Sequence, residues 1–329
     1  MKILHICAGW QQWNGAANIA RMLMDEQRRE GHEVSSAPWA KVRELCAADE
    51  VWIHCGWLPC LWWAALWGRN IRWMPEACYD PVRLGFHGWK KWLVGPIERW
   101  CLRRCSKIVA TCEAESEWIR AYEPRVKSIE VTDIKRFFNL NPVNPVNPVK
   151  KDLHLLYLGR RHPLKGLSYL ETALATYYNK CSSAPSSLAP TTACADNPSS
   201  NPSRKAATYY NKCPIEFRVV SDAFGDELER VWDWCDVLVL PTLSENFGLV
   251  IAEALERGKR VITTDGAPAW GENLSRVERV DGGMWSGYGG RLIYLKGYRD
   301  GTPEDRVRLL KSAIENLLSR ASLTPPAAK

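Results

Sequence analysis

The chain lacks a run of apolar residues long enough to cross a membrane. Its most apolar segment, residues 58–67, is about half the roughly 20 residues that a transmembrane helix needs. Residues 1–7 resemble a short apolar strand, and they lack the long hydrophobic stretch and the small-residue cleavage site of a secretory signal. We therefore expect a cytoplasmic protein.

The sequence also lacks a C-x-x-C pair, although it contains 12 cysteines. Most zinc and redox sites use closely paired cysteines, whereas these are scattered through expected strands and helices. Cys101 and Cys105 are four residues apart, which places them on one face of a helix. Without a second pair of ligands, reduced and mostly buried thiols are a better interpretation than a metal site. We expect neither a bound metal nor a cofactor.

At 329 residues the chain is longer than one typical domain. Its composition, 46% hydrophobic and 25% charged, is that of a globular protein with enough apolar side chains for two cores. Strands are predicted at residues 1–8, 51–55 and 108–111, and a helix at 16–30 that ends at Gly31-His32. Strands that alternate with helices are typical of a parallel sheet covered on both faces.

Two low-complexity stretches interrupt this alternation. Asn-Pro-Val occurs three times between residues 141 and 149, and proline at every third position favours an extended segment. We interpret residues 141–150 as a linker between an N-terminal domain, 1–140, and a C-terminal domain, 151–329. Within the latter, a seven-residue segment recurs verbatim on either side of a Ser/Pro/Ala/Asn-rich stretch, which predicts a disordered insert at about residues 182–206 without a function of its own.

The second half again has the β-α-β pattern of parallel strands. Strands are predicted at residues 153–158, 215–220, 237–240 and 260–264, and helices from about residue 165 and at 226–234, 247–257 and 306–319. The fold class is therefore α/β, with two Rossmann-like, doubly wound domains that face a cleft.

Ligands of such sheets bind at the carboxyl ends of the strands, and two of these ends are polar here. Residues 159–166 follow a strand and carry Arg160 and Lys165 on a turn that leads into a helix, whose N-terminus also attracts anions. A diphosphate is the ligand that this turn favours. Taken alone, the turn is explained equally well as a solvated loop whose charges bind no ligand.

The second polar end is the segment 240–249. Here a helix predicted from Phe247 or Gly248 presents backbone N–H groups, and Gly248 allows a ligand to approach the backbone. Glu245 lies in the loop and Glu253 inside the helix, so the two carboxylates could hold sugar hydroxyls at two depths. Alternatively, Glu245 interacts with the helix dipole and Glu253 is a surface residue, although Ala252 and Ala254 flank it on an apolar helix.

These segments resemble retaining glycosyltransferases with the GT-B fold. Glu245 and Glu253 form the E-x7-E pattern, and Gly159-Arg160 followed by Lys165-Gly166 resembles the G-R-x(4)-K-G element of glycosyltransferase family 4. Residues 258–270 are similar to the segment that follows E-x7-E, while Gly15 and residues 108–113 fit the N-terminal half. The chain thus resembles the group 1 glycosyltransferases of bacterial polysaccharide and lipopolysaccharide synthesis.

The resemblance implies a role for each site residue. Arg160 and Lys165 would hold the donor diphosphate and stabilise its charge as it leaves. Glu253 would bind the ribose, and Glu245 would hold the transferred sugar. The remaining donor-binding residues would be Gly15, Asn246, Phe247, Gly248 and Leu249. The sugar would move with retention of configuration, without a metal ion and without a protein nucleophile.

One position departs from the family. Some subfamilies have Pro-His-Gly-Met-Leu-Asp-Pro, with a histidine that reaches the sugar, where this chain has Pro75-Glu76-Ala77-Cys78-Tyr79-Asp80-Pro81. Glu76 would then accept from a sugar hydroxyl or assist the acceptor. The change indicates either altered specificity, which we favour, or impaired activity.

The basic charge is concentrated in one segment. The net charge is +7, and residues 69–107 contain nine basic and three acidic residues, which leaves +6 there, interleaved with tryptophans. Such a surface fits reversible contact with an anionic membrane face or an anionic acceptor, an ordinary solvated face, or nucleic acid. We do not expect nucleic acid because no nucleic-acid motif accompanies the segment.

The expected partners are therefore a nucleotide-sugar donor and a glycan or lipid-linked acceptor. A nucleotide-sugar epimerase of the same fold, or an inactive donor-binding protein, are the alternatives. An epimerase would need acid/base residues in both domains, and Glu76 is the only candidate that we identify in the first.

Overall fold

The computed structural model describes residues 1–7, 15–54, 59–140, 153–181, 215–221, 223–272, 279–280 and 284–322. The chain divides into two compact units, each with its own sheet. The first comprises Met1–Asn141, Thr242–Glu256 and Asp265–Val277, and the second comprises Pro142–Pro241, Arg257–Thr264 and Glu278–Lys329. The predicted linker at 141–150 and the insert at 182–206 lie outside the described residues, so the predicted domain boundaries stay predictions.

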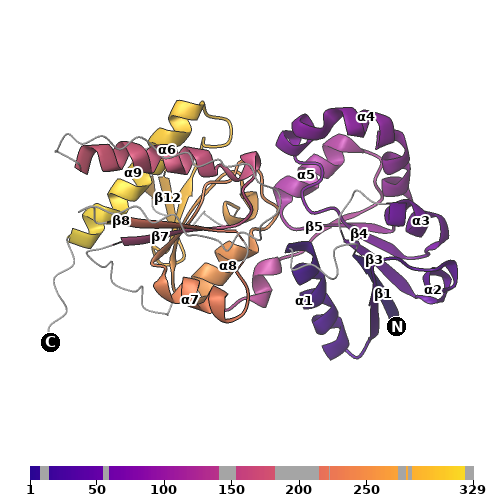
Figure 1. Ribbon diagram of the computed structural model, residues 1–329. Coiled ribbons are helices and arrows are strands. Elements are labelled where there is room, and N and C mark those ends of the chain that lie inside the picture. Colours follow the sequence, from indigo (N-terminus) through magenta and orange to yellow (C-terminus); the bar gives the residue numbers. More distant parts are fainter. Residues whose placement is uncertain are drawn as a thin grey trace, which may run out of the picture. The chain divides into compact units, whose positions relative to one another are not determined.

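The sheet of the first unit has six parallel strands in the order β2-β1-β3-β4-β5-β6 (Figure 1). Its strands are β1 (Lys2–Cys7), β2 (Glu33–Ala37), β3 (Glu50–His54), β4 (Ile71–Met74), β5 (Lys107–Ala110) and β6 (Ile129–Val131). The helical elements between them are α1 (Gly15–Arg29), α2 (Val42–Ala47), α3 (Pro59–Trp67), α4 (Pro81–Arg104) and α5 (Glu113–Tyr122), and the 3-10 turn η1 (Ile134–Phe137) follows β6. The predicted α/β alternation is confirmed, although β4 and β6 are too short for the sequence pattern to reveal them.

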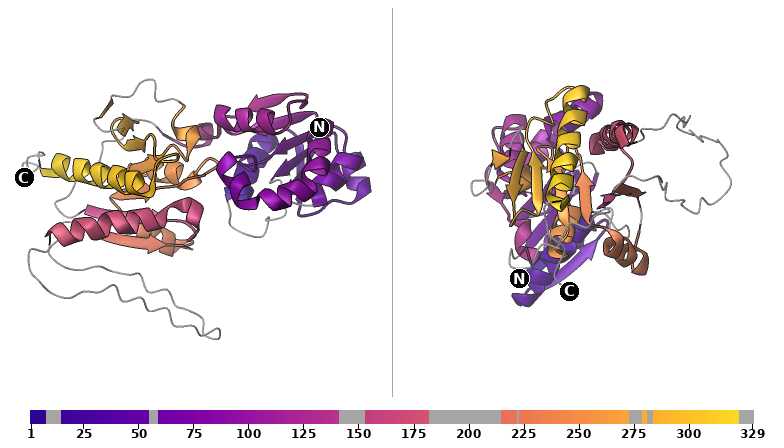
Figure 2. Two further views of the ribbon diagram at one scale, coloured as in Figure 1. Left: turned by 90° about the horizontal axis from the view of Figure 1, so that it is seen from above. Right: turned by 90° about the vertical axis from the view of Figure 1, so that its left-hand side faces the viewer.

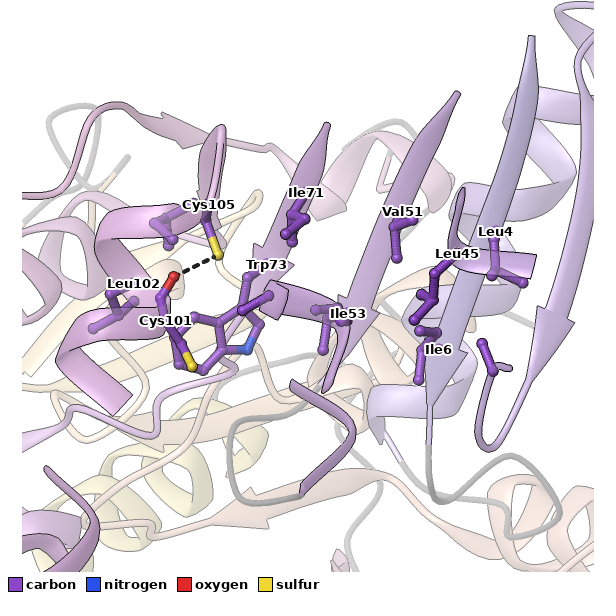
Figure 3. Close-up of a cluster of buried hydrophobic side chains, with 14 of the residues drawn as sticks. Leu4, Ile6, Leu45, Val51, Ile53, Ile71, Trp73, Cys101, Leu102 and Cys105 are labelled. Atoms are coloured by element: carbon purple, nitrogen blue, oxygen red, sulfur yellow. Dashed lines mark hydrogen bonds between the residues drawn. The ribbon is translucent and has the colours of Figure 1, made fainter. Parts of the chain in front are cut away.

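A buried hydrophobic cluster covers one face of this sheet and joins it to α4 (Figure 3). Trp73 of β4 is fully buried and packs edge-on against Tyr79, with 5.9 Å between the ring centroids. Cys101 and Cys105 of α4 belong to the cluster, and burial raises the pKa of Cys101 to about 12. Both thiols are therefore free and buried, as predicted. Other members drawn in Figure 3 are Leu4, Ile6, Leu45, Val51, Ile53, Ile71 and Leu102.

The opposite face of β1 and β3 carries histidines instead. Side chains alternate along a strand, so His5 lies on the other face from Leu4 and Ile6. The parallel register places His5 beside Trp52, and Cys7 beside His54. Two imidazoles thus come close together on the face that α1 covers, where Gln27 of α1 hydrogen-bonds to His5.

The sheet of the second unit has seven strands in the order β11-β12-β13-β10-β9-β7-β8. Its strands are β7 (Leu153–Leu158), β8 (Ile215–Val220), β9 (Val237–Leu240), β10 (Arg260–Thr264), β11 (Arg279–Val280), β12 (Met284–Gly287) and β13 (Leu292–Leu295). Strand β12 is antiparallel to both of its neighbours, whereas the sequence pattern predicted parallel strands alone. Strands β11 and β12 have only two and four residues, so they give a weak sequence signal.

Helices α6 (Leu167–Cys181) and α9 (Pro303–Ser322) pack side by side in the second unit (Figure 2). Arg306 of α9 fixes this contact, because its Nη1 donates to the Tyr169 hydroxyl of α6 at 2.8 Å. None of the helices in the described ranges is both long and apolar enough to cross a membrane.

In the second half of the chain, the bounds of the strands and helices agree closely with those predicted from the sequence. The predicted ranges of β7, β8, β9 and β10 are confirmed, as is that of α7 (Asp226–Trp234). Helix α8 (Leu249–Glu256) begins two residues later than the first predicted start. The reason is that Gly248 has a left-handed φ of 73° and the Phe247 carbonyl accepts a hydrogen bond from the Trp270 indole. Helix α6 begins at Leu167 because the 3-10 turn η2 (Pro163–Lys165) and a left-handed Gly166 precede it.

Candidate functional site

The ten predicted site residues fall in two groups. Arg160 and Lys165 belong to the second unit. The first unit contains the other eight, which are Gly15, Glu76, Glu245, Asn246, Phe247, Gly248, Leu249 and Glu253.

In the second unit, the turn after β7 presents its cations to solvent. Arg160 is exposed and Lys165 is half-buried, while Leu164 between them is buried and anchors the turn. The Tyr157 hydroxyl donates to the Arg160 carbonyl at 2.9 Å. The N–H of Leu164 donates to the side chain of His162, which caps η2. These contacts fix the backbone of the turn that carries the two cations.

Gly166 ties this turn to the end of β9. Its φ of 66° is left-handed, and a Cβ atom added to it would lie 1.9 Å from the Pro241 carbonyl oxygen. The Tyr298 hydroxyl would lie 3.0 Å away from the same atom. Only glycine fits, since both the conformation and the space exclude a side chain. Lys165 and Gly166 therefore lie next to Pro241, at the end of β9.

In the first unit, two loops support the segment that leads into α8. A Cβ atom on Gly266 would lie 2.1 Å from the Thr242 carbonyl oxygen, so these backbones are in close contact. The Glu245 N–H donates to the Gly266 carbonyl at 2.7 Å. The Trp270 indole N–H donates to the Phe247 carbonyl at 2.5 Å, and both rings are buried. These contacts fix the direction in which α8 begins.

The two glutamates of the E-x7-E pattern are half-buried. Glu245 lies in the loop, where its Oε1 accepts from the Asn246 N–H at 3.2 Å. Glu253 lies on α8 between two buried alanines, so its carboxylate is neither a core group nor a fully solvated one. Gly15 opens α1, and a Cβ atom there would lie 3.9 Å from Leu249. The structure thus brings Gly15 to the first turn of α8.

Ser244 connects this loop to the segment around Glu76. Its hydroxyl accepts from Arg83 Nε at 2.9 Å and donates to the fully buried Asp80 carboxylate. Asp80 also caps α4 by accepting from the Val82 N–H at 2.9 Å. Sequence reasoning missed Asp80 and Arg83 as functional residues. Asp followed by proline is a helix-start signature that would have located the cap.

Glu76 lies in a strained turn. Glu76 and Ala77 have φ values of 55° and 58°, a left-handed conformation that costs a non-glycine residue about 1–3 kcal/mol. Arg83 Nη1 donates to the Glu76 carbonyl at 3.3 Å, and the Ala77 N–H donates to Glu115 at 2.6 Å. Strain of this kind persists only where surrounding contacts over-determine it, and such places cluster at functional sites.

Glu115 of α5 is the buried carboxylate that holds these loops together. It accepts from the Ala77 N–H and from the N–H and hydroxyl of Thr111, at 2.6, 2.7 and 2.8 Å. Burial raises the pKa of Glu115, while these hydrogen bonds favour its ionised form. The Thr111 hydroxyl lies 2.9 Å from Asn246 Oδ1. Sequence reasoning missed Glu115 because its partners lie on other loops.

No group of three or more histidine, cysteine or acidic side chains in the described ranges is arranged to hold a metal ion. Cys101 and Cys105 face the hydrophobic cluster, where the Cys105 thiol donates to the Cys101 carbonyl. This pair is therefore part of the core.

Two family models match the chain. The model described as "Glycosyl transferases group 1" matches residues 152–281, and the model described as "Glycosyl transferase 4-like domain" matches residues 35–132. Together they cover most of both halves. A comparison with curated protein sequences gives no match.

Solved structures similar to this chain span nearly its whole length. HepE of Anabaena in complex with UDP-glucose has 13% sequence identity and a TM-score of 0.57, covering 98% of this chain and 94% of that chain. Sucrose-phosphate synthase of Thermosynechococcus elongatus has 13% identity and a TM-score of 0.60, covering 98% of this chain and 90% of that chain. At this identity the similarity establishes the fold.

The contact at Gly166 predicts a large effect of a small substitution. Gly166→Ala should cost the roughly 1–2 kcal/mol of a left-handed alanine and about 1–3 kcal/mol more for the clash with Pro241. Gly258→Ala is the matched control, since Gly258 has a φ of 71° and no atom within 4 Å of the added Cβ. Free energies of unfolding from denaturant titration compare the two variants. Equal losses would contradict the close packing at Gly166.

Proposed function

Because the chain belongs to the group 1 glycosyltransferases and has their GT-B fold, we propose that it is a retaining enzyme that moves a sugar from a nucleotide-sugar donor to a glycan or lipid-linked acceptor. The reaction would serve cell-surface polysaccharide or lipopolysaccharide synthesis. The observation that carries the proposal is the position of the loop 242–248. A close backbone contact with Gly266 and a hydrogen bond from the Trp270 indole direct this loop into the N-terminus of α8.

The donor diphosphate would bind Arg160 and Lys165. Both cations lie on a turn whose backbone is fixed, so they stabilise the developing charge without reorganising. We propose that this positive charge, with the dipole of a helix N-terminus, takes the part that a divalent metal plays elsewhere. Transfer would then proceed without a metal ion.

The sugar and ribose would bind the segment from Glu245 to Glu253. The N-terminus of α8 presents backbone N–H groups that have no partner inside the helix. The N–H group of Leu249, with those of Phe247 and Gly248 just before the helix, would donate to sugar hydroxyls. Glu245, together with Asn246, would hold the transferred sugar, and Glu253 would hold the ribose hydroxyls. Gly15, which lies against Leu249, leaves room for the donor beside α8.

A thermal-shift screen with UDP-, GDP-, ADP- and dTDP-glucose in the presence of EDTA tests the donor site. One nucleotide class should stabilise the protein, by about 2.7 kcal/mol when the donor is at 100 times its Kd. Lys165→Ala and Glu253→Ala should abolish the shift, since each removes a contact to the donor. UDP-sugars are the first donors to test, because a structure similar to this chain contains UDP-glucose.

Two substitutions of the same kind serve as controls. Lys259→Ala removes another half-buried lysine, and Glu227→Ala removes an exposed glutamate of α7. Both should keep the full shift. A shift that survives in Lys165→Ala and Glu253→Ala would contradict the assignment of the site.

We also propose that α4 and α3 contact an anionic membrane surface reversibly. Phe86, Leu93, Ile97 and Trp100 recur along one side of α4, and together with Trp92, which is 80% exposed, they are apolar side chains that face solvent. Leu66 and Trp67 of α3 are exposed as well, and Arg104 Nε donates to the Ala65 carbonyl, which joins the two helices. Exposed aromatic and aliphatic side chains of this kind favour the interface of a bilayer.

The charge available to this surface is smaller than the sequence count of +6 indicates. Three basic residues of the segment form ion pairs with acids from outside it: Arg72 with Glu50, Arg103 with Glu123, and Lys107 with Glu130. Arg99 and Arg104 remain exposed near the end of α4. We therefore attribute the proposed contact to apolar insertion supported by a few charges.

Sedimentation with vesicles tests this contact. The protein should bind vesicles of phosphatidylglycerol mixed with phosphatidylcholine more strongly than pure phosphatidylcholine. Trp92→Ala should weaken binding several-fold, whereas Phe224→Ala, at a ring that is 54% exposed in the second unit, should not change it. Equal binding to both vesicles, or equal effects of the two substitutions, would contradict the proposal.

A further inference from the structure

Two charged side chains hold the hydroxyl of Ser244, the residue directly before Glu245. The hydroxyl donates to Asp80 Oδ2 and accepts from Arg83 Nε at 2.9 Å. Ser244 is 1% exposed and Asp80 is fully buried, so both lie away from bulk solvent. A hydroxyl has one proton to donate, and here a carboxylate accepts it. The Ser244 side chain is therefore fixed in one orientation between a negative and a positive group.

Asp80 divides its two oxygens between the helix and the loop. Its Oδ1 accepts from the Val82 N–H at 2.9 Å and so caps α4, while its Oδ2 accepts from Ser244. Capping uses one oxygen, and asparagine caps a helix about as well as aspartate does. An asparagine would face Ser244 with an amide N–H group, which cannot accept the serine proton. The contact with the loop therefore explains why a carboxylate stands at position 80.

Arg83 connects the same loop to the turn that follows β4. Its Nε donates to the Ser244 hydroxyl at 2.9 Å, and its Nη1 donates to the Glu76 carbonyl at 3.3 Å. The guanidinium group is planar and its donors point in fixed directions, so the two bonds set the spacing between the turn and the loop. A lysine would not reproduce this arrangement, because its ammonium group is a single point on a flexible stem.

Glu245 itself is held by its neighbours along the loop. Its N–H donates to the Gly266 carbonyl at 2.7 Å, and its Oε1 accepts from the Asn246 N–H at 3.2 Å. A Cβ atom on Gly248 would lie 3.2 Å from Glu245 Cγ, so the glutamate side chain packs against this glycine. The Asn246 side chain lies 2.9 Å from the Thr111 hydroxyl. The orientation of the Glu245 carboxylate therefore depends on how the backbone on either side of it is anchored.

We propose that Asp80 and Arg83 are positioning residues that hold Glu245 in the orientation in which it meets the transferred sugar. They act through Ser244 rather than by touching the substrate. Anchoring of this kind matters because a displacement of about 1 Å in a catalytic site lowers the rate roughly a hundredfold. The inference rests on the function proposed above, in which Glu245 holds the sugar.

Amide hydrogen exchange of the protein without any ligand tests the anchoring. Asp80→Asn keeps the cap of α4 and removes the acceptor for Ser244, whereas Ser244→Ala removes the hydroxyl. Arg83→Lys keeps the charge and removes the fixed geometry. In each variant a peptide that covers 242–248, including the Glu245 N–H, should exchange roughly tenfold faster, as expected when a hydrogen bond to a charged group is lost. The double variant Asp80→Asn/Ser244→Ala should exchange no faster than its single variants, because both remove the same contact.

Asp133→Asn is the matched control, since Asp133 caps η1 by accepting from the Lys135 N–H at 3.0 Å. It should leave exchange at 242–248 unchanged. Strand β1 should keep its slow exchange in every variant, which separates a local change from unfolding. Unchanged exchange at 242–248 in Asp80→Asn and Ser244→Ala, or additive effects in the double variant, would overturn the inference.

A comparison of UDP with UDP-glucose tests the effect on the sugar. In the proposed site, residues other than Glu245 hold the nucleotide. Asp80→Asn and Arg83→Lys should therefore leave the Kd of UDP unchanged and lower kcat for UDP release from UDP-glucose roughly tenfold or more. Equal weakening of UDP and UDP-glucose binding would show a merely structural role and would overturn the inference. A wild-type protein that binds neither ligand would contradict the proposed function instead, while the exchange measurement still decides the anchoring.

Discussion

The first unit depends on one buried carboxylate. Glu115 is 1% exposed, and an ionised carboxylate at that depth is stable only when donors surround it. Those donors are the N–H groups of Ala77 and Thr111 and the Thr111 hydroxyl. Ala77 belongs to the loop that follows β4 and Thr111 to the loop that follows β5. The hydrogen bonds to Glu115 therefore fix both loops. The left-handed turn at Glu76 and the contact between Thr111 and Asn246 both follow from this constraint.

Close contacts between loops also position the residues of the proposed site. The strands supply rigid, apolar cores, while the polar groups lie on loops at their carboxyl ends, held by backbone contacts that exclude any side chain. Gly166 against Pro241 and Gly266 against Thr242 are the closest of these contacts. They fix the backbone and leave Arg160, Lys165, Glu245 and Glu253 at least partly accessible to a ligand. Glu76 differs from these residues, because it is buried and its carboxylate lies 3.9 Å from the buried His54.

Local sequence signals predicted much of this architecture. The strands at 153–158, 215–220, 237–240 and 260–264 are short apolar runs bounded by turn residues, which need no distant information. The glycosyltransferase elements were located because each is a compact motif. The His5–His54 pair could not be predicted, since its residues are 49 positions apart and meet only through the register of β1 and β3. Glu115 and the start of α8 likewise depend on partners remote in the sequence.

We propose that the sugar moves at the front face of the donor, with neither Glu245 nor Glu253 acting as a nucleophile. The most direct test is the configuration at C1 of the sugar released from α-linked UDP-glucose, recorded by proton NMR before the anomers equilibrate. Retention, with the α-anomer appearing first, is the predicted result. Initial appearance of the β-anomer would show inversion and contradict the account.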